Sequence, residues 1–257
     1  MFPVATVTTS WDDGDPADVR VAQLLRTRRL PGTFYIPVMG RRGLPTLSQA
    51  AMRDLASEGF EIGGHGVSHR NLSGMSADHC WNEVHGAKQF LEDVLGKEIA
   101  MFCYPRGRHD EIVVKTVARA GYIGARTTRM LATDIAFDAY RMPTTVHAFN
   151  HKPSGYLRNL LRTRNLSGIF RYATVYRYCE NWVQLAKTLF DSTLRDGGVW
   201  HLYGHSWEIQ ELEMWPQLEE VLDYVSGRDD VLYACNSEIV RRRTAENRKI
   251  GPAERSN

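Results

Sequence analysis

Two adjacent aspartates near the start of the chain are candidates for acid–base or metal chemistry. Asp12 and Asp13 stand in the sequence SWDDG, directly after an apolar run from Val4 to Thr9. An aspartate pair followed by glycine is also ordinary turn chemistry, and by itself it indicates no more than surface charge. Its meaning depends on which other reactive side chains the fold brings to the same place.

Two histidines are suitable partners for that pair. The sequence EIGGHGVSHRNL, from Glu61 to Leu72, places His65 and His69 four residues apart. The glycines of this stretch disfavour a regular helix, so we expect a shaped loop after a strand. Imidazole nitrogens suit zinc and similar ions, and a carboxylate from another strand end would complete a three-ligand site with one open position, as in catalytic zinc centres.

The aspartate pair could then divide the work between its two members. One carboxylate would bind the metal ion beside His65 and His69, and the other would stay off the metal and accept a proton from a water molecule that the metal activates. From the residues alone, either Asp12 or Asp13 could take either role. The pattern is typical of a metal-dependent hydrolase.

The elements that must position these residues alternate between short apolar runs and longer amphipathic ones. The predicted strands cover Val4–Thr9, Thr33–Ile36, Phe60–Ile62, Ala100–Tyr104, Tyr122–Ala125, Val199–Leu202 and Val231–Ala234. Between and after them, capping residues and apolar periodicity predict helices. The first helix is expected after an N-cap at Asp15 and the last after a cap at Asn236. Those between them are expected over Gln49–Ser57, Ser76–Leu95, Asp110–Ala120, Asn181–Arg195 and Gln217–Val225.

This alternation predicts an α/β fold with a parallel sheet and helical crossovers. With so many strand–helix units, a closed or partly closed barrel is expected rather than an open sheet. Chemistry in such barrels lies at the carboxyl ends of the strands. The segments at those ends are Ser10–Gly14, Gly63–His69, Tyr104–Arg108 and Tyr203–His205. We therefore expect these segments to line one site.

We expect one barrel domain over residues 1–244 and a polar tail over residues 245–257. Residues 127–178 lack a readable period and predict an irregular excursion from the barrel. Within it, arginines and aromatic residues mingle between Arg158 and Tyr178. Two interpretations remain open: a solvated basic face, or a surface for an anionic, lipid-linked or membrane-surface substrate.

The composition excludes several classes of protein. The chain has 257 residues, of which 43% are hydrophobic, and a net charge of +2 that gives no reason to expect a nucleic-acid partner. No apolar run approaches the roughly 18 residues of a membrane span, and no signal peptide is recognisable. The four cysteines are widely spaced and form no CxxC pair, so we expect free thiols. A cytoplasmic protein is the simplest expectation.

At these motifs the chain resembles the polysaccharide deacetylase superfamily, the NodB-homology fold of carbohydrate esterase family 4. SWDDG is similar to the family motif T-F-D-D-G, and His65 to His69 (HGVSH) is similar to H-S/T-x-x-H. The resemblance implies a distorted (β/α) barrel and a divalent metal ion, with Zn²⁺ the expected ion. It also implies that Asp12 is the catalytic base and that Asp13 is the metal ligand beside His65 and His69.

The third family motif, R-x-P-Y-G, aligns with Cys103 to Gly107 (CYPRG), where cysteine replaces the arginine that steadies the base in the family. Arg126, at the next strand end, is our first candidate for the replacement, and Arg106 is the second. Arg106 also takes the place of the family tyrosine whose backbone N–H faces the developing oxyanion, a role that any side chain allows. Gly66 stands where the family has a bracing hydroxyl, which Ser68 could supply.

The late family motif L-x-H, which supplies a general acid, matches best within WHLYGHSWE, Trp200 to Glu208. We prefer His205 as the general acid because His201 lies inside a predicted strand. Tyr104, Trp207 and Glu208 are predicted to bind the sugar, although Trp207 and Glu208 could equally form the cap and first turn of a helix. The remaining histidines are expected to be structural or surface residues, with His147 the least certain: His79, His85, His109, His147 and His151.

The resemblance implies an amide hydrolase that removes N-acetyl groups from an amino sugar in an oligo- or polysaccharide or its precursor. Hydrolysis of another linear or cyclic amide, such as a ureide or imide, is the alternative enzyme. A non-catalytic glycan-binding relative is the third hypothesis. The intact set Asp12, Asp13, His65 and His69 disfavours the third, because a binding module needs no base beside a metal.

Overall fold

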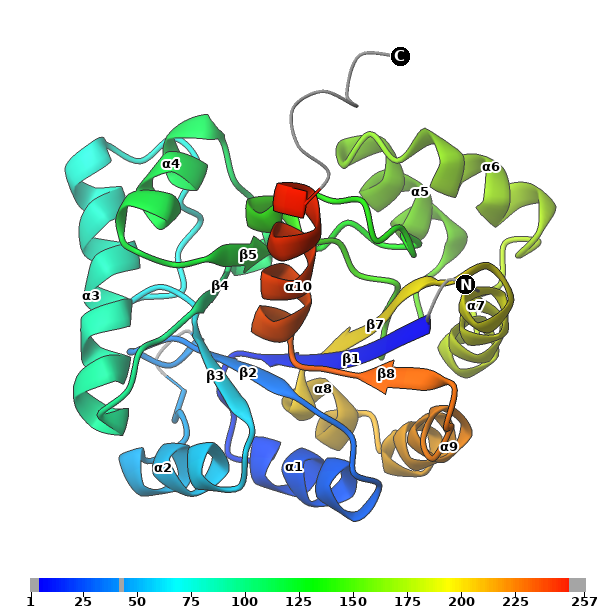
Figure 1. Ribbon diagram of the computed structural model, residues 1–257, viewed down its shortest axis with the longest axis horizontal. Coiled ribbons are helices and arrows are strands. Elements are labelled where there is room, and N and C mark those ends of the chain that lie inside the picture. Colours follow the sequence, from blue (N-terminus) through cyan, green and yellow to red (C-terminus); the bar gives the residue numbers. More distant parts are fainter. Residues whose placement is uncertain (1–4, 42–43, 250–257) are drawn as a thin grey trace.

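The computed structural model describes residues 5–41 and 44–249, which form a curled parallel sheet surrounded by helices (Figure 1). Within these residues the sheet has eight strands, in the order β5-β4-β3-β2-β1-β7-β6, with β8 paired to β1. The strands are β1 (Ala5–Asp12), β2 (Thr33–Ile36), β3 (Glu61–Gly64), β4 (Met101–Cys103), β5 (Gly124–Arg126), β6 (Val146–His147), β7 (Gly198–Gly204) and β8 (Val231–Tyr233). This is the distorted (β/α) barrel expected from the sequence.

Helices cover the outside of the sheet and connect successive strands. They are α1 (Asp18–Thr27), α2 (Gln49–Ser57), α3 (Ala77–Leu95), α4 (Glu111–Arg119), α5 (Pro153–Arg162), α6 (Leu166–Thr174), α7 (Trp182–Asp196), α8 (Ser206–Glu211), α9 (Trp215–Val225) and α10 (Asn236–Lys249). Two short 3₁₀ turns, η2 (Pro105–Gly107) and η3 (Ala139–Arg141), follow β4 and β5. Ser48, Ser76 and Asp110 cap α2, α3 and α4 by accepting a hydrogen bond from a first-turn N–H.

Strand β1 is the central strand of the sheet. All of its residues are buried, and it pairs with β7 along almost its whole length. On the opposite side, Ala5–Val7 pair with β8 and Ser10–Asp12 pair with β2. Because all of these pairings are parallel, Asp12 emerges at the same end of the sheet as the carboxyl ends of β2 and β7.

The segment from Met142 to His147 bridges the gap between the β5 edge of the sheet and β7, and most of it is not regular strand. Its first residue bonds to the β5 edge, where Met142 N donates to Ala125 O at 2.9 Å and Thr127 N donates to Met142 O at 2.9 Å. Its end bonds to β7, where Thr145 N donates to His201 O at 2.9 Å. One short segment thus joins the two free edges of the sheet. The stretch expected to be an irregular excursion is in part a component of the barrel, and α5 and α6 are what projects from it.

Some element boundaries differ from those expected. Strand β1 runs on to Asp12 rather than ending at Thr9. Asp15 does not cap α1; its side chain accepts from Ala17 N at 2.9 Å in a local turn, and Ala17 is the N-cap. A turn precedes the helix because Asp15 and Pro16 favour turn geometry before a helix can start. Helix α9 begins at Trp215, with Pro216 in its first turn.

Three further expectations concern the ends of the chain, its hydropathy and its cysteines. The start of the first predicted strand, Val4, and residues 250–257 of the predicted tail lie outside the described residues. Within the described ranges, no helix is long and apolar enough to cross a membrane. All four cysteines are free thiols, as expected.

Substitution of Asn236 tests how much the hydrogen bonds of this buried residue contribute to the stability of the protein. Its fully buried amide accepts from Thr8 Oγ1 at 2.9 Å and donates to the Tyr35 hydroxyl oxygen at 2.9 Å. Asn236→Ala should lower the free energy of unfolding by about 1–3 kcal/mol, because it leaves buried polar groups without partners. Urea denaturation measures this. The exposed Asn82→Ala on α3 is the matched control, and an equal loss in both variants would contradict the prediction.

Candidate active site

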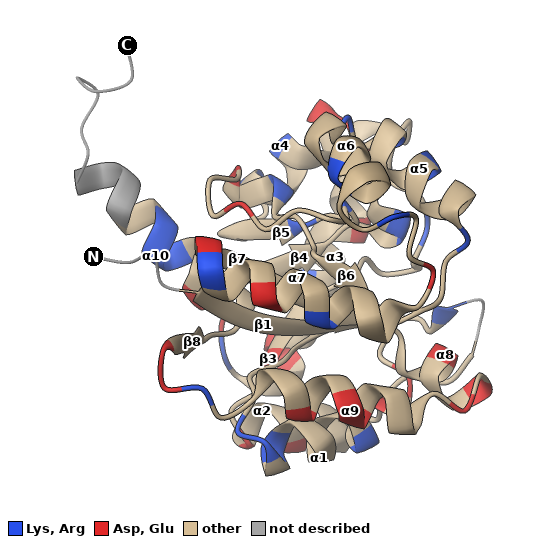
Figure 2. Ribbon diagram, turned by 90° about the vertical axis from the view of Figure 1, so that its right-hand side faces the viewer, with Lys and Arg blue, Asp and Glu red and all other residues tan. Residues whose placement is uncertain are grey.

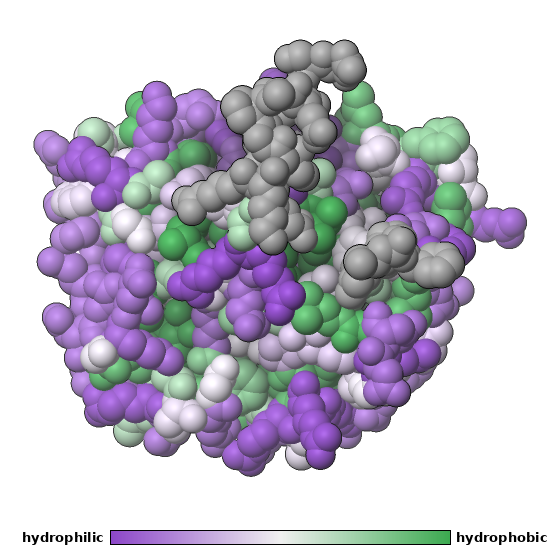
Figure 3. Space-filling model, in the orientation of Figure 1, coloured by the Kyte–Doolittle hydropathy of each residue, from purple (hydrophilic) through white to green (hydrophobic). Residues whose placement is uncertain are grey.

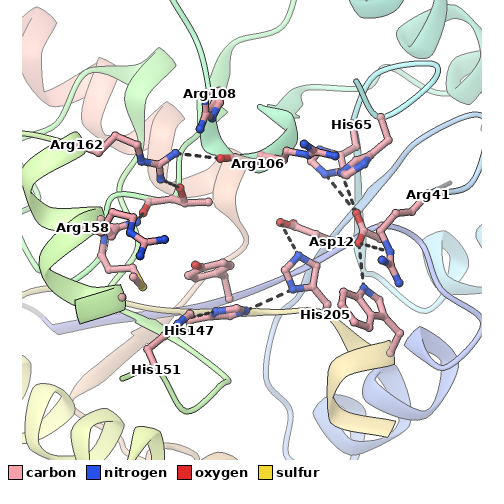
Figure 4. A pocket seen from close by; sticks show the side chains of 18 residues that line it. Asp12, Arg41, His65, Arg106, Arg108, His147, His151, Arg158, Arg162 and His205 are labelled. Atoms are coloured by element: carbon pink, nitrogen blue, oxygen red, sulfur yellow. Dashed lines mark hydrogen bonds and ion pairs between the residues drawn. The ribbon is translucent and has the colours of Figure 1, made fainter. Parts of the chain in front are cut away.

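A cavity of about 550 Å³ opens at the carboxyl ends of β1, β3, β4 and β7 (Figure 4). The side chains around it combine acidic, histidine, arginine and aromatic groups. They belong to Asp12, Asp13, Arg41, His65, His69, Arg106, Arg108, Thr128, Met130, His147, His151, Gly155, Arg158, Asn159, Arg162, Tyr203, His205 and Trp207. The fold therefore brings together the four segments that we expected at one site.

Asp13, His65 and His69 face one another at one side of this cavity. Asp13 Oδ1 lies 3.1 Å from His69 Nε2 and 3.7 Å from His65 Nε2. This buried oxygen has no hydrogen-bond partner within the described part of the chain. One carboxylate oxygen and two imidazole nitrogens converging in this way match the donor set of a divalent metal site.

Both histidines are oriented by the loop that follows β3. His65 Nδ1 lies 2.8 Å from Cys103 O, so Nδ1 carries the proton and donates it, and Nε2 remains available as a ligand. Burial lowers the pKa of His65 to about 4, which keeps the ring neutral at neutral pH. Glu83 on α3 accepts from Val67 N at 2.9 Å and from the backbone N–H and hydroxyl of Ser68. Ser68 thus braces the loop, as we expected, and its partner is Glu83.

Asp13 is held by its second oxygen. Trp207 Nε1 donates to Asp13 Oδ2 at 3.0 Å, and Arg41 Nε lies 3.3 Å from the same atom. The Arg41 guanidinium also lies 3.8 Å from the centre of the Trp207 ring. Burial alone would raise the pKa of Asp13, but contact with His69 and the charges of the nearby histidines outweigh it and lower the pKa well below its usual range.

Asp12 has a different partner, Arg126. The two side chains form a completely buried ion pair through Arg126 Nη2 and Asp12 Oδ1. Arg126 stands on β5 directly beside Cys103 of β4 in the strand register. The arginine therefore reaches the base from the neighbouring strand, at the position paired with the cysteine that replaces the family arginine. Arg106, the second candidate, is an exposed residue that lines the cavity, and it forms no hydrogen bond or ion pair with Asp12.

The charge balance around Asp12 favours its ionised form. Burial would raise the pKa of its carboxyl, but the interactions with Arg126, His65 and His205 together outweigh burial, and the pKa is lowered. Cys103 Sγ lies 3.8 Å from Asp12 Oδ2, and burial raises the pKa of this thiol, so it is neutral. Asp12 is therefore an ionised carboxylate that makes no hydrogen bond to His65 or His69.

His205 faces Asp12 from the end of β7. Its Nε2 lies 3.9 Å from Asp12 Oδ2, and its Nδ1 lies 2.7 Å from Glu208 Oε2. Burial would lower the pKa of His205, but the contact with Glu208 and, to a smaller extent, the charges of Asp12 and Asp13 together outweigh burial and raise the pKa to about 9. His201, the competing histidine, is buried in β7 with one ring nitrogen on Ser10 Oγ and the other on Pro143 O. His205 is thus the protonated imidazole that faces the cavity.

Two predicted sugar-binding residues have other contacts. Tyr104 is buried, and its hydroxyl donates to Tyr140 O at 2.9 Å, so its side chain does not reach the cavity. Glu208 lies in the first turn of α8, which directs its carboxylate back onto His205 and onto His147 Nε2, 3.1 Å away. Both predictions of sugar contact are corrected. Trp207 does line the cavity, and its sugar-stacking role stays a prediction.

Several cavity residues were missed from the sequence or were assigned elsewhere. His147 and His151, expected to be structural or surface histidines, line the cavity and contact each other through Nδ1 and Nε2 at 2.8 Å. They reach it because β6 is part of the barrel, which its short length concealed. Arg41 and Glu83 stand in no recognisable motif. Arg158 and Arg162 belong to the basic stretch, where their spacing of four residues on one helix was the available signal.

Comparisons with known proteins agree with this geometry. Residues 2–125 match the sequence model of the polysaccharide deacetylase family. A peptidoglycan-N-acetylglucosamine deacetylase from Bacillus cereus is 31% identical over 118 residues, covering 45% of this chain and 53% of that protein. A peptidoglycan-N-acetylmuramic acid deacetylase from Bacillus subtilis is 27% identical over 120 residues, covering 46% of this chain and 44% of that protein. The chain spans about half the length of these relatives.

Solved structures extend the likeness of fold to nearly the whole chain. A putative polysaccharide deacetylase from Mycobacterium smegmatis superposes with a TM-score of 0.63 at 18% identity, covering 96% of this chain and 95% of that one. A family 4 carbohydrate esterase from Streptomyces lividans gives a TM-score of 0.53 at 13% identity, covering 90% and 92%. The chain thus has the fold of these deacetylases, and residues 2–125 resemble the polysaccharide deacetylase family in sequence.

Proposed function

We propose that the protein is a metal-dependent hydrolase that removes N-acetyl groups from an amino sugar in an oligo- or polysaccharide or its precursor. The observation that carries the proposal is the division of the cavity into two sets of groups. Asp13, His65 and His69 form a ligand set, while Asp12 and His205 face each other as an ionised carboxylate and a protonated imidazole. Relatives described as peptidoglycan deacetylases support the same reaction.

A divalent metal ion, for which Zn²⁺ is our expectation, would be held by Asp13, His65 and His69. The unpartnered Asp13 Oδ1 and the tautomer that Cys103 imposes on His65 fit such an ion. When bound, the ion would polarise the amide carbonyl and lower the pKa of a water molecule. Arg41 and Trp207 would hold the second oxygen of Asp13 and so keep the first directed at the ion.

The protein's own groups would carry the proton transfers. Asp12, kept ionised by Arg126, would accept a proton from the attacking water. His205, kept protonated by Glu208, would donate a proton to the amine nitrogen as the C–N bond breaks and acetate is released. The backbone N–H of Arg106 is our candidate for the donor to the developing oxyanion. Its left-handed conformation, with φ of 58°, is a strained geometry of the kind found at functional sites.

Measured acetate release tests this function directly. The protein, loaded with Zn²⁺, would be given N-acetylglucosamine oligosaccharides, N-acetylmuramic acid, a cyclic ureide and a cyclic imide. Release of acetate from the sugars with no opening of the cyclic amides supports the proposal. Ring opening without acetate release would replace it with the alternative amide hydrolase, and binding without turnover would favour a glycan-binding protein. The cytoplasmic location stays a prediction.

The two aspartates should fail differently when each is changed to asparagine. Asp12→Asn should retain Zn²⁺ but lose roughly 10²- to 10⁴-fold in kcat, the usual worth of a positioned base. Asp13→Asn should lose Zn²⁺ affinity as well, because a neutral amide is a poorer ligand than a carboxylate. Competition titration with a zinc-binding dye and steady-state kinetics provide the two readouts.

The matched control is Asp54→Asn, an exposed aspartate on α2, which should leave both readouts unchanged. His69→Ala should resemble Asp13→Asn, while the exposed His79→Ala should resemble the unmodified protein. If Asp12→Asn emptied the site and Asp13→Asn left it filled, the two roles would have to be exchanged. A change of less than tenfold in rate for both aspartates would count against the hydrolase itself.

Glu208→Gln tests whether this carboxylate sets the proton affinity of His205. Glu208 raises the pKa of His205 to about 9 because its negative charge stabilises the imidazolium. Removing that charge should move the pKa down toward about 6.5, the ordinary value for histidine. NMR titration of the His205 ring in the metal-free protein measures the shift, and the basic limb of kcat/KM should move to lower pH in parallel. Exposed Glu211→Gln is the control; an unmoved His205 pKa in Glu208→Gln would refute the assignment.

A further inference from the structure

One side of the cavity is lined by arginine side chains that the mechanism does not use. Arg158 and Arg162 project from α5, and Arg106 and Arg108 lie along the upper edge in Figure 4. Within residues 5–41 and 44–249, the side chains of Arg106, Arg108 and Arg158 have no hydrogen bond, ion pair or ring contact. They are therefore available to a ligand.

Arg162 anchors this set. Its guanidinium donates to Arg106 O at 3.3 Å and to Thr128 Oγ1 at 2.9 Å, which holds it against the cavity wall. Burial lowers the pKa of Arg162, and the positive charge of Arg108 lowers it further. The positive charges of Arg108 and Arg162 repel each other, and no carboxylate in the described part of the chain is among the groups that offset this repulsion.

The carboxylates of the cavity already have other partners. Asp12 is paired with Arg126, and Asp13 contacts Arg41, His65 and His69. Between Asp138 and Glu180 the sequence contains no acidic residue at all. The excess of positive charge along α5 and η2 is therefore uncompensated, and an anion is the ligand that would balance it.

We infer that Arg108 and Arg158, with Arg106 and Arg162, bind a phosphate or carboxylate group carried by the sugar substrate close to the scissile amide. Arginine suits such groups because its planar fork of N–H donors matches their oxygens. A neutral polysaccharide would leave these guanidinium groups unpaired in the cavity. The inference rests on the proposed deacetylase function and specifies the chemical class of its substrate.

Matched pairs of substrates test this inference. The Zn²⁺-loaded protein would be assayed with N-acetylglucosamine against N-acetylglucosamine-1-phosphate, and against N-acetylmuramic acid, which carries a carboxylate. We expect kcat/KM to be at least tenfold higher for one or both charged sugars, and the two charged sugars distinguish phosphate from carboxylate. The double variant Arg108→Gln/Arg158→Gln should reduce this ratio at least tenfold through KM.

The control is Arg242→Gln, an exposed arginine on α10 that lies outside the cavity, which should leave the ratio unchanged. Equal kcat/KM for charged and neutral sugars, or a ratio insensitive to the double variant, would overturn the inference while leaving the deacetylase function intact. Absence of acetate release from every sugar would instead remove the deacetylase function itself, and the two failures are thereby distinguishable.

A second, independent observation concerns the outer face of α5 and α6. Large apolar side chains are exposed there, with 64% exposure for Leu161, 74% for Leu166 and 68% for Phe170. Leu166 and Phe170 are four residues apart and share one face of α6. Figure 3 shows green side chains standing among purple ones at this edge of the molecule, and Figure 2 shows basic positions on both helices.

The geometry points to an anionic lipid surface as the partner of this face. Exposed leucine and phenylalanine flanked by arginines, with no acidic residue nearby in the sequence, form the pattern of a helix that inserts its apolar side at a membrane interface. The flanking arginines Arg164, Arg171 and Arg177 would meet the negative headgroups.

Vesicle co-sedimentation tests this partner. The full chain should bind phosphatidylglycerol vesicles at least tenfold more tightly than phosphatidylcholine vesicles, and Phe170→Ser with Leu166→Ser should reduce binding at least fivefold. Ile112→Ser, which changes a residue of α4 with 56% exposure, is the matched control. Absence of binding, binding that these changes leave intact, or self-association in solution that the double variant abolishes would each overturn the proposal.

Discussion

The buried ion pair between Asp12 and Arg126 is the interaction on which the site depends. Two opposite charges withdrawn from water are tolerable only when their geometry is good, and removal of one partner typically costs about 3–5 kcal/mol. The barrel provides that geometry through its strand register, and the Arg126 guanidinium lies between the rings of Tyr35 and Tyr203, 5.3 and 5.0 Å away. Because Arg126 pairs with Asp12, the Asp13 carboxylate is the one that faces His65 and His69. The different surroundings of Asp12 and Asp13 thus follow from the packing of the barrel interior.

Much of the arrangement follows from the parallel sheet and was predictable. The carboxyl ends of parallel strands gather at one edge, so motifs after β1, β3 and β7 had to meet whatever the details of the helices. Register then selects among candidates, as it does for Arg126, which stands beside Cys103. The position of His201 inside a strand separated it from His205, and in the structure both ring nitrogens of His201 have partners in the core.

Other features could not be predicted, for identifiable reasons. His147 ends the closing segment, of which only two residues form a regular strand, too short for any periodicity, and His151 lies in the loop that follows. Arg41 and Glu83 act through long side chains on elements whose placement depends on tertiary packing. Glu208 was assigned to the substrate because sequence position does not say which way a side chain in the first turn of a helix will point. Tyr104 was similarly assigned outward and is part of the core.

The pairing of Cys103 with Arg126 has a consequence for recognising proteins of this kind. Either β4 or β5 can supply the guanidinium, since a side chain from either strand at this register position can reach the Asp12 carboxylate. A sequence pattern that scores each position separately counts Cys103 as a missing arginine and would classify the chain as lacking part of its site. A pattern that scores the two register partners jointly finds one arginine between them and no loss. In this chain the arginine beside Asp12 is therefore found only when the residues paired across β4 and β5 are considered together.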